Sequence, residues 1–455
     1  MSSTATVPPS STQILVVGGG PSGTYTDAAL AREGFQVTLL EKDLFPRYHI
    51  GETFLASLKT FLKFIDVLDK VNDFGFAENS LLKTRADFDD LLFKHAAECG
   101  AKAIDGVQIT AIKFSPDDPK KPVAAEWKSA QGSGEIKFDW LVDASGRNGI
   151  MSTRYLKNRK FTQALKNIAI WGYWEGHGVY MPGTSRENAP WFEALTYETG
   201  WTWFIPLHNG TVSVGDGRLA SEIKSAGDYS YSSSNNQYSG PNYRIVGDAG
   251  ADIQLDPLFS SGVHLAFSGA LSAALTISAS IRGHCTEEEA IAFHNQKIGV
   301  SYTRFTVVVL GVYKQIHAQE SSVLSDIDED NFDRAFDFIR PVIQGDSDTH
   351  SKMEEIQKTI NFLAETPGIV GTDPETAEKL RQHLPSEMAD NGPFLEKKVI
   401  TQLSGDDQEA KDLLEGMNSK KAITGMYNWA DNFAGDNLPG FSVVLKKGSL
   451  GLRRE

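Results

Sequence analysis

Cysteine, net positive charge and long apolar runs are the features that this sequence has least of. Only two of its 455 residues are cysteines, Cys99 and Cys285, which excludes a disulfide framework and a cysteine metal cluster and is typical of a reducing compartment. Asp and Glu outnumber Lys and Arg by 59 to 44. The net charge of −15 argues against nucleic acid or an anionic membrane as a main partner. We therefore expect a cytoplasmic protein without a bound metal.

Uninterrupted apolar stretches are shorter than the roughly 20 residues that a membrane-spanning helix needs. The longest, Phe305 to Val312, continues into Tyr313 and Lys314 and predicts a core helix. Residues 1–12 lack the basic and apolar pattern of a signal peptide and are expected to form a disordered arm. The length suffices for two or three domains, or for one large composite domain.

The stretch from Gln13 to Glu41 has the pattern of a strand, a glycine-rich turn, a helix and a second strand. An apolar strand-type run leads into Gly18, Gly20 and Gly23 in G-x-G-x-x-G spacing, followed by a helix and a second apolar run. The three glycines allow a tight turn, close approach of a pyrophosphate and close packing of helix on strand, and the helix N-terminus attracts phosphates. Glu41 follows at about the distance, ~20 residues, where an acid accepts from a ribose hydroxyl. The unit predicts a dinucleotide site; a βαβ unit with nothing bound is the alternative.

Asp27 departs from the pattern of this unit. It lies four residues after Gly23, on the helix face that packs toward the sheet, where a small apolar residue is expected. A carboxylate there is either turned out to solvent or costs stability.

The middle of the chain carries helices, then strands, then an aromatic β-rich region. The predicted elements are helices from about Leu55 to Phe74 and Asp87 to Cys99, and strands at Val107–Phe114, Val123–Lys128 and Ile136–Val142. Residues 168–214 are β-rich, whereas 216–240 show no clear element. Beyond Glu287 the chain reads as mostly helical and acidic.

Two later strands end in short loops with a carboxylate. The first runs into Asp143–Gly149, where backbone and carboxylate could meet a flavin or its ribose, unless this is a plain strand-to-loop turn. The second enters Gly-Asp-Ala-Gly, where Asp248 could hold a ribityl chain. The helix that follows begins at Ser261–Val263, and its positive dipole end would favour a reduced flavin anion or a halide.

The segment GWTWFIPLHNGTVSVG predicts a hairpin with its turn at residues 208–210. Alternation along the strand places Trp201 and Trp203 on one face. Two indoles on one face of a strand form core more often than pocket.

In this order, GGGPSG, FPRYHIGET, DASGRNG, WTWFIP and GDAG…DPLFSSGVHLA resemble the flavin-dependent halogenases, in particular the fungal enzymes that chlorinate phenolic rings of polyketides. The segment Trp201–Pro206 matches the W-x-W-x-I-P signature that separates halogenases from other flavin monooxygenases. The resemblance extends from about residue 12 to 350 and less clearly to the C-terminus.

The resemblance implies FADH2 delivered by a separate NAD(P)H-dependent flavin reductase, O2, and chloride or bromide that is oxidised and passes through a tunnel to an aromatic substrate. The signature tryptophans would keep the substrate away from the flavin. The candidate residues are Gly18, Gly19, Gly20, Ser22, Gly23, Glu41, Arg47, Glu52, Asp248 and Val263 for FAD, Ser261 and Gly262 for chloride, and Trp201, Trp203 and Lys83 for catalysis.

The sequence also departs from the family. The family's catalytic lysine follows a Gly-Phe pair, but after Gly75-Phe76 the segment that should carry it is missing. Lys83 is the nearest lysine, either as a substitute amine or as a solvated residue before a helix. A second segment is missing after Gly215, and the loop after Asp248 is longer than in the family. These departures indicate a diverged enzyme or a gene model with misplaced introns.

The predicted fold is α/β: a Rossmann-like FAD-binding domain with an inserted β-rich substrate domain and a helical C-terminal part. Its predicted divisions are the arm 1–12, the FAD-binding parts 13–150 and 241–285, the substrate layer 151–240 and the helical region 286–455. Three functions remain open: a halogenase of an aromatic polyketide pathway, an FAD monooxygenase or oxidase that lost halide chemistry, and a flavin-binding remnant without catalysis.

Overall fold

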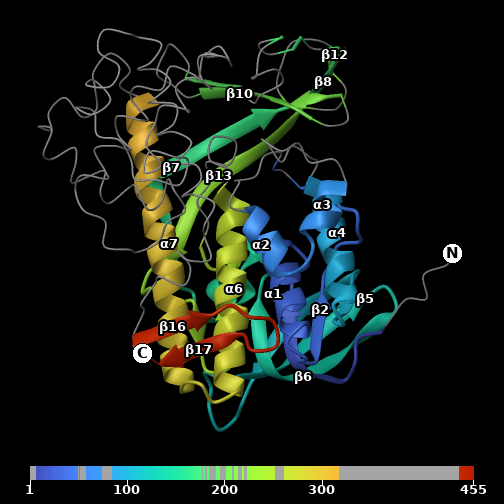
Figure 1. Cartoon of the computed structure of the whole chain (residues 1–455), viewed down its shortest axis with the longest axis vertical. Helices are drawn as coiled ribbons and strands as arrows, with labels where there is room; N and C mark the ends of the chain where they lie inside the picture. The colour runs from blue at the N-terminus through green and yellow to red at the C-terminus, as the bar shows by residue number, and fades with distance from the viewer. Residues whose placement is uncertain are drawn as a thin grey trace, which may run out of the picture.

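The structure is a computed structural model, and only part of the chain is described from it. The described residues are 7–49, 51, 58–73, 85–176, 178–179, 182–183, 191–194, 201–207, 210–213, 218–219, 223–251, 261–316 and 440–454. They form an α/β fold with a mixed sheet, helices packed against it and a smaller β layer at one end (Figure 1).

The main sheet is built around β1, which pairs in parallel with β2 on one side and β6 on the other. The strand order is β14-β15-β6-β1-β2-β3, and the antiparallel strands β4 and β5 extend from β6. The bounds are β1 Ser11–Val17, β2 Val37–Leu40, β3 Lys102–Ile104, β4 Val107–Phe114, β5 Pro122–Ser129, β6 Gly132–Asp143, β14 Ser239–Gly240 and β15 Tyr243–Ile245. Short 3-10 or π turns lie at Gly146–Asn148, Ile150–Tyr155 and Gly247–Ala249.

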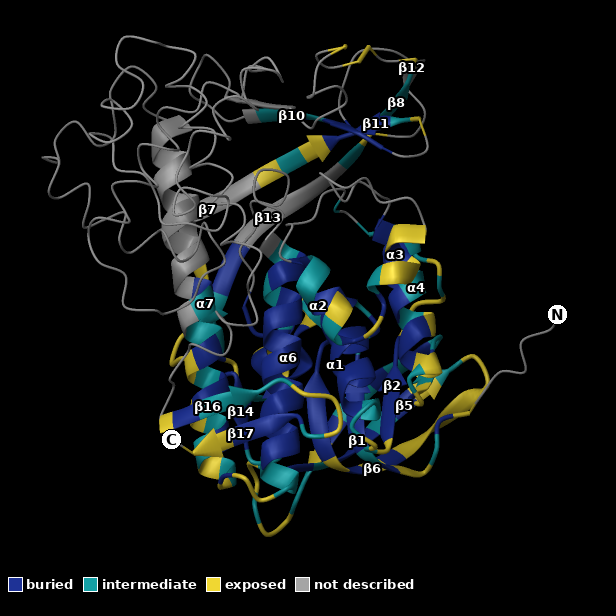
Figure 2. Cartoon of the chain, in the orientation of Figure 1, coloured by how far each residue is buried: buried dark blue, intermediate teal, exposed yellow. Residues whose placement is uncertain are grey.

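The helices pack on the sheet with α1 and α6 at the centre of the core. Their bounds are α1 Pro21–Ala31, α2 Leu58–Phe64, α3 Leu68–Asp73, α4 Arg85–Glu98, α6 Ser261–Ile281 and α7 Glu287–Ile316. Figure 2 shows α1 and α6 almost wholly buried between the sheet and the outer helices. Burial of these apolar residues is the main driving force for this part of the fold.

Among the described helices, α6 is the one long and apolar enough, by length and composition, to cross a membrane. Its 20 residues from Gly262 to Ile281 have a mean hydropathy of 1.4. The longest uninterrupted apolar run in the sequence, Phe305 to Val312, lies in α7 instead, because small polar residues interrupt the apolar residues of α6. With 89% of the window buried inside the fold, α6 is a core helix.

The β layer comprises a five-stranded antiparallel sheet, order β12-β8-β11-β10-β9, and a long two-stranded ribbon of β7 and β13. The bounds are β7 Arg159–Trp171, β8 Tyr173–Glu175, β9 Trp191–Ala194, β10 Trp201–Pro206, β11 Val212–Ser213, β12 Arg218–Leu219 and β13 Lys224–Ser233. The predicted hairpin is present as β10 paired with β11. Figure 1 shows β7 and β13 running from the main sheet up to this layer.

Three predictions about elements differ from the structure. The single helix expected over Leu55–Phe74 is divided into α2 and α3, because Asp66 between them has a positive φ of 58°. The strand β13 forms in a stretch with no predicted element, since its long ladder with β7 compensates for weak local signals. At the N-terminus β1 begins at Ser11, inside the expected arm, because residues 11 and 12 pair with β6.

The C-terminal end is a β-hairpin, at the end of a region, 286–455, that the sequence predicts to be mostly helical. The hairpin consists of β16 Phe441–Val444 and β17 Gly451–Arg454. Phe441, Leu450 and Leu452 are buried in the core beside α6, and backbone N–H groups of residues 448 and 450 donate to Glu33 at 2.8 and 3.0 Å. The hairpin is therefore stabilised by docking of these apolar residues on the core, because its local sequence carries no clear strand signal.

Candidate functional site

The site is built on the turn between β1 and α1. Gly18 has a φ of 108°, and a Cβ there would lie 2.2 Å from the carbonyl oxygen of Ala144. A Cβ at Gly23 would lie 1.8 Å from the carbonyl oxygen of Gly18. At Gly20 the nearest atom is Arg47 Nη2, at 3.6 Å. The first and third glycines are thus required by close backbone packing, whereas the second leaves the backbone open to a ligand.

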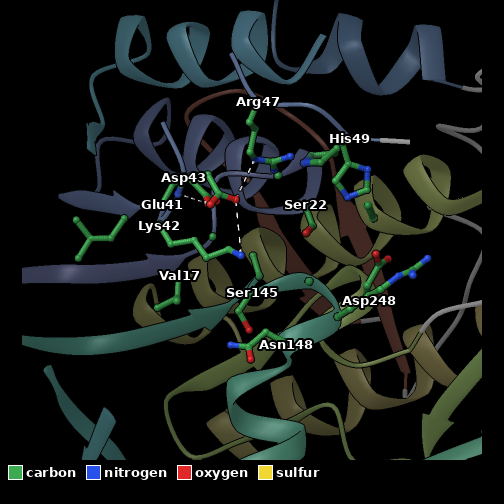
Figure 3. A pocket seen from close by; sticks show the side chains of 18 of the residues that line it. Val17, Ser22, Glu41, Lys42, Asp43, Arg47, His49, Ser145, Asn148 and Asp248 are labelled. Atoms are coloured by element: carbon green, nitrogen blue, oxygen red, sulfur yellow. Dashed lines mark hydrogen bonds and ion pairs between the residues drawn. The ribbon is translucent and has the colours of Figure 1, made fainter. Parts of the chain in front are cut away.

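A cavity of about 320 Å³ lies in front of this turn. It extends from Val107–Ile109 on β4, past the ends of β1 and β2, to Ala266 on α6. Seven of the predicted site residues line it: Gly18, Gly20, Ser22, Glu41, Arg47, Asp248 and Gly262. Figure 3 shows Arg47 and His49 on one side of the cavity and Ser145 and Asn148 on the other.

The remaining predicted residues do not line the cavity or cannot be placed. Gly19 and Gly23 belong to the turn behind it, and Val263 is buried in the core, which leaves only its backbone for the predicted flavin contact. Glu52 and Lys83 lie outside the described residues, and so does the side chain of Ser261. Among the residues that are described, no cluster of metal-binding side chains is found.

Glu41 is held at the end of β2 with its carboxylate against the glycine-rich turn. It is 4% exposed, and its Oε2 accepts a hydrogen bond from the Gly19 N–H at 2.5 Å while Oε1 accepts from the Asp43 N–H at 2.9 Å. Each carboxylate oxygen can accept a further bond. A ribose hydroxyl in the cavity would therefore find a fixed, buried acceptor.

Replacing Glu41 by alanine is expected to weaken FAD binding by about 1–3 kcal/mol, because a buried ribose hydroxyl would lose its acceptor. The measurement is the dissociation constant of FAD by flavin fluorescence, with the melting temperature of the apoprotein recorded in parallel. Glu126→Ala, which removes a half-exposed carboxylate beside Lys113, is the control. Equal FAD affinity in Glu41→Ala and the control would remove this role.

The carboxylate of the Asp143–Gly149 loop is turned inward rather than toward the cavity. Asp143 is 1% exposed; its Oδ1 accepts from the Ser145 hydroxyl at 2.6 Å and its Oδ2 from the Met151 N–H at 2.7 Å. Burial raises the pKa of Asp143, and these bonds oppose the rise. The loop meets the cavity through Ser145 and its neighbours, and Asp143 holds its shape.

The start of α6 approaches the cavity from the other side. Gly262 and Ala266, one turn apart, line it, and Asp248 lies beside them after β15. His264 points away into the core, with its ring edge-on to Phe61 at a centroid distance of 5.6 Å. Burial lowers the pKa of His264 to about 4, so its imidazole is neutral at pH 7 and the helix N-terminus supplies the positive potential here.

Trp203 forms part of the core of the β layer. It is 6% exposed, packs with Trp171, Ile205 and Leu207, and donates a hydrogen bond from Nε1 to the Ser213 hydroxyl at 2.9 Å. It does not line the cavity, so for this indole the structure favours core over pocket. The Trp201 side chain lies outside the described residues.

Tyr48 joins the cavity to the β layer. Tyr48 lines the cavity. Its hydroxyl lies 3.1 Å from Nε1 of Trp171, which donates to it, and 3.0 Å from the hydroxyl of Tyr173. Trp171 packs on Trp203 in one cluster. The cavity and the strand that carries W-x-W-x-I-P are therefore connected through two contacts.

Arg85 and Asp89 are among the residues of the site that were not predicted from the sequence. Arg85 lines the cavity, and buried Asp89 pairs with both Arg85 and Arg47. Their spacing of four residues at the start of a helix was the available signal. Nothing local, however, indicated that Arg47 would meet them.

The tertiary structure resembles solved halogenases. The myxobacterial chondrochloren halogenase CndH matches with a TM-score of 0.60 and 20% identity, covering 98% of this chain and all of the other. The flavin-dependent brominase Bmp2 matches with a TM-score of 0.62 and 18% identity, over 78% of this chain and all of the other. At this identity the likeness shows the fold alone.

Sequence relatives are much nearer. The flavin-dependent halogenase armH1 of Armillaria mellea is 47% identical over 98% of this chain and 99% of the relative. The flavin-dependent halogenase ascD of Acremonium egyptiacum is 43% identical over 98% of this chain and 93% of the relative. The alignment with armH1 has 522 positions, 67 more than the chain's 455 residues, so this chain lacks at least 67 residues that armH1 has.

The family described as tryptophan halogenase matches residues 13–77 and 80–386. The interruption at 78–79 begins two residues after Phe76, close to where the sequence indicates a missing segment. Outside that interruption the match includes the dinucleotide turn, the β layer and the start of α6. This chain belongs to the flavin-dependent halogenases.

Proposed function

We propose that the chain is an FADH2-dependent halogenase that uses O2 and chloride or bromide on an aromatic, phenolic polyketide-type metabolite. The observation that supports this most is the halogenase signature Trp201–Pro206 in a β layer that Tyr48 joins to the dinucleotide cavity. Relatives named flavin-dependent halogenases share 40–47% identity with it. The proposal includes a separate flavin reductase and a cytoplasmic location.

The residues around the cavity fit FAD. The open backbone at Gly20 suits a pyrophosphate, and the N-terminus of α1 attracts its charge. Glu41 offers an acceptor for a ribose hydroxyl, and Arg47 offers a cation beside the turn. When bound, reduced FAD supplies the electrons that activate oxygen.

The chain's own residues can bind an anion and exclude bulk water. At the start of α6, Gly262 presents backbone rather than a side chain to the cavity, and the helix dipole favours an anion there. Trp203 and Trp171 close the neighbouring β layer with apolar surface, which keeps bulk water out of it. This arrangement suits a reaction in which oxidised halide must reach an organic substrate before it escapes.

A second candidate is an FAD monooxygenase or oxidase. It is favoured by one feature of the sequence: the resemblance places the family's lysine in a segment that is missing after Phe76, near the interruption of the family match at residues 78–79. The halogenase needs a catalytic amine, for which Lys83 is the proposed substitute. The monooxygenase or oxidase needs no such amine.

Purified protein supplied with a flavin reductase, NADH, FAD, O2 and bromide is expected to brominate at least one of a small set of phenols. Mass spectrometry would detect the bromine isotope pair, and omission of bromide is the control. Loss of product in Lys83→Met but not in Lys94→Met would assign the amine. Oxidised product that forms without halide would replace halogenation by the second candidate.

A further inference from the structure

Two arginines from different parts of the chain border the cavity and share one buried acid. Arg47 lies in the loop after β2, Arg85 begins α4, and both line the cavity. Asp89, one turn further along α4, is fully buried. Its Oδ1 accepts from Nε of Arg85 at 2.7 Å, and its Oδ2 lies 3.3 Å from Nη1 of Arg47.

These contacts leave other guanidinium nitrogens directed at the glycine-rich turn and the loop beside it. Nη2 of Arg47 lies 3.6 Å from where a Cβ of Gly20 would stand, and Nη1 of Arg85 lies 3.3 Å from the corresponding point at Gly51. Gly20 is the glycine whose open side faces the cavity. The arginine pair is thus positioned beside the backbone that would meet a pyrophosphate.

A second contact from α4 supports the same loop. The ring of Phe93 stacks on that of Phe45 at 4.6 Å, and the guanidinium of Arg47 lies 5.1 Å over the Phe45 ring. Helix α4 therefore contacts Arg47 directly through Asp89 and supports it indirectly, because Phe93 packs on the Phe45 ring that lies under the guanidinium. Side chains held in this way lose little entropy when they bind a ligand.

The charge balance at this cluster favours an anion. Asp89 pairs with both guanidinium groups, and the half-exposed Asp43 lies 4.0 Å from Nε of Arg47 and 3.7 Å from Nζ of Lys42. These three cations outnumber the two carboxylates, and the side chains of Arg47 and Arg85 are only 15% and 9% exposed. Shielding them from water is costly unless further negative charge arrives. A diphosphate supplies that charge, and guanidinium groups bind phosphate oxygens with directed hydrogen bonds.

We propose that Asp89 is a positioning residue that aims Arg47 and Arg85 at the diphosphate of FAD. The inference rests on the flavin-binding part of the proposed function and is independent of the halide chemistry. Asp89 itself touches no ligand. Its effect on binding passes through the two arginines.

The test compares ligands that carry the diphosphate with one that lacks it. Dissociation constants of FAD, ADP and riboflavin are measured for the full-length chain and for Asp89→Asn, Asp89→Glu and Asp90→Asn. Asp90 is the matched control, because it is the next residue on α4 and pairs with Lys94 on the outer face at 2.6 Å. Melting temperatures of the apoproteins are recorded alongside.

Asp89→Asn is expected to weaken FAD and ADP binding at least tenfold, to leave riboflavin binding within twofold, and to flatten the salt dependence of ADP binding. Asp89→Glu should recover part of the affinity, and Asp90→Asn should match the wild type. Equal weakening of all three ligands, or unchanged ADP binding, would overturn the inference and leave Asp89 a structural ion-pair residue.

Arg47→Gln and Arg85→Gln provide the same comparison if Asp89→Asn does not fold. Each should weaken ADP and FAD but not riboflavin, and unchanged ADP binding in either variant would contradict the proposal. A wild-type chain that binds no flavin would refute the proposed function itself. A wild type that binds FAD but does not halogenate would leave the role of Asp89 intact.

Discussion

Gly23→Ala is expected to destabilise the apoprotein by about 3 kcal/mol or more, at the upper end of what single substitutions cost. The added Cβ would stand 1.8 Å from the carbonyl oxygen of Gly18 and 3.2 Å from the Cβ of Ala144. Gly18 cannot retreat, because its N–H donates to the carbonyl of Leu40 at 2.9 Å and its φ is already positive. Chemical unfolding of the apoprotein followed by circular dichroism would measure the loss.

Gly20→Ala is the matched comparison, since the same methyl group is added three residues earlier. Its Cβ meets nothing nearer than Arg47 Nη2 at 3.6 Å, so the apoprotein should lose no more than about 1 kcal/mol, the cost of alanine at a helix N-cap. FAD affinity should still fall at least tenfold, because the methyl group projects into the cavity. If Gly20→Ala bound FAD normally, the pyrophosphate would not pass over this turn.

Asp27→Ala is expected to stabilise the protein by about 1–3 kcal/mol at pH 7, the cost of a buried polar group without a hydrogen bond. Asp27 is 0% exposed, and neither carboxylate oxygen has a hydrogen-bond partner among the described residues. The sequence left open whether this carboxylate turns out to solvent or costs stability. In the structure it is buried, which favours a cost. Burial raises the pKa of this carboxyl well above its usual value.

The same substitution should change the pH dependence of stability. The pKa of Asp27 is raised in the folded state, so the folded protein holds this proton more tightly than the unfolded chain does. The free energy of unfolding of the wild type therefore keeps its full value below about pH 4 and falls as pH rises toward the folded pKa. The gap between Asp27→Ala and the wild type should therefore widen with pH. Urea unfolding at pH 5 and pH 8 measures it, with Asp27→Asn as a control that removes the charge but keeps a buried polar group. A gap that narrows with pH would contradict this prediction, because it would mean that the fold stabilises the ionised carboxylate of Asp27.

The part of the site that could be predicted is local in the chain. Gly18, Gly20 and Glu41 line the cavity, with Gly23 packed behind them, because one strand, one turn and one helix bring them there. The elements that failed prediction are stabilised from a distance. Strand β13 depends on its ladder with β7. The sequence left Asp143 open between a flavin contact and a plain turn, and in the structure its carboxylate accepts hydrogen bonds from Ser145 and Met151.

The aromatic signature illustrates the same limit. The sequence placed Trp201 and Trp203 on one strand face but could not decide between core and pocket. For Trp203 the structure favours core, because Trp171 and Leu207 pack with the indole and Ser213 accepts its hydrogen bond. The neighbours that decide burial come from strands β7 and β11 as well as its own.

By itself the sequence determined the βαβ unit and its glycine turn, because backbone freedom and hydrophobic periodicity act over a few residues. The family followed from the resemblance of the ordered motifs to those of the halogenases. Only the tertiary structure decided that Asp89 would pair with Arg47, 42 positions earlier, and that the C-terminal hairpin would dock beside α6. Such contacts join residues distant in the chain. Their energy comes from burial and charge pairing, which exist only once the fold has brought the partners together.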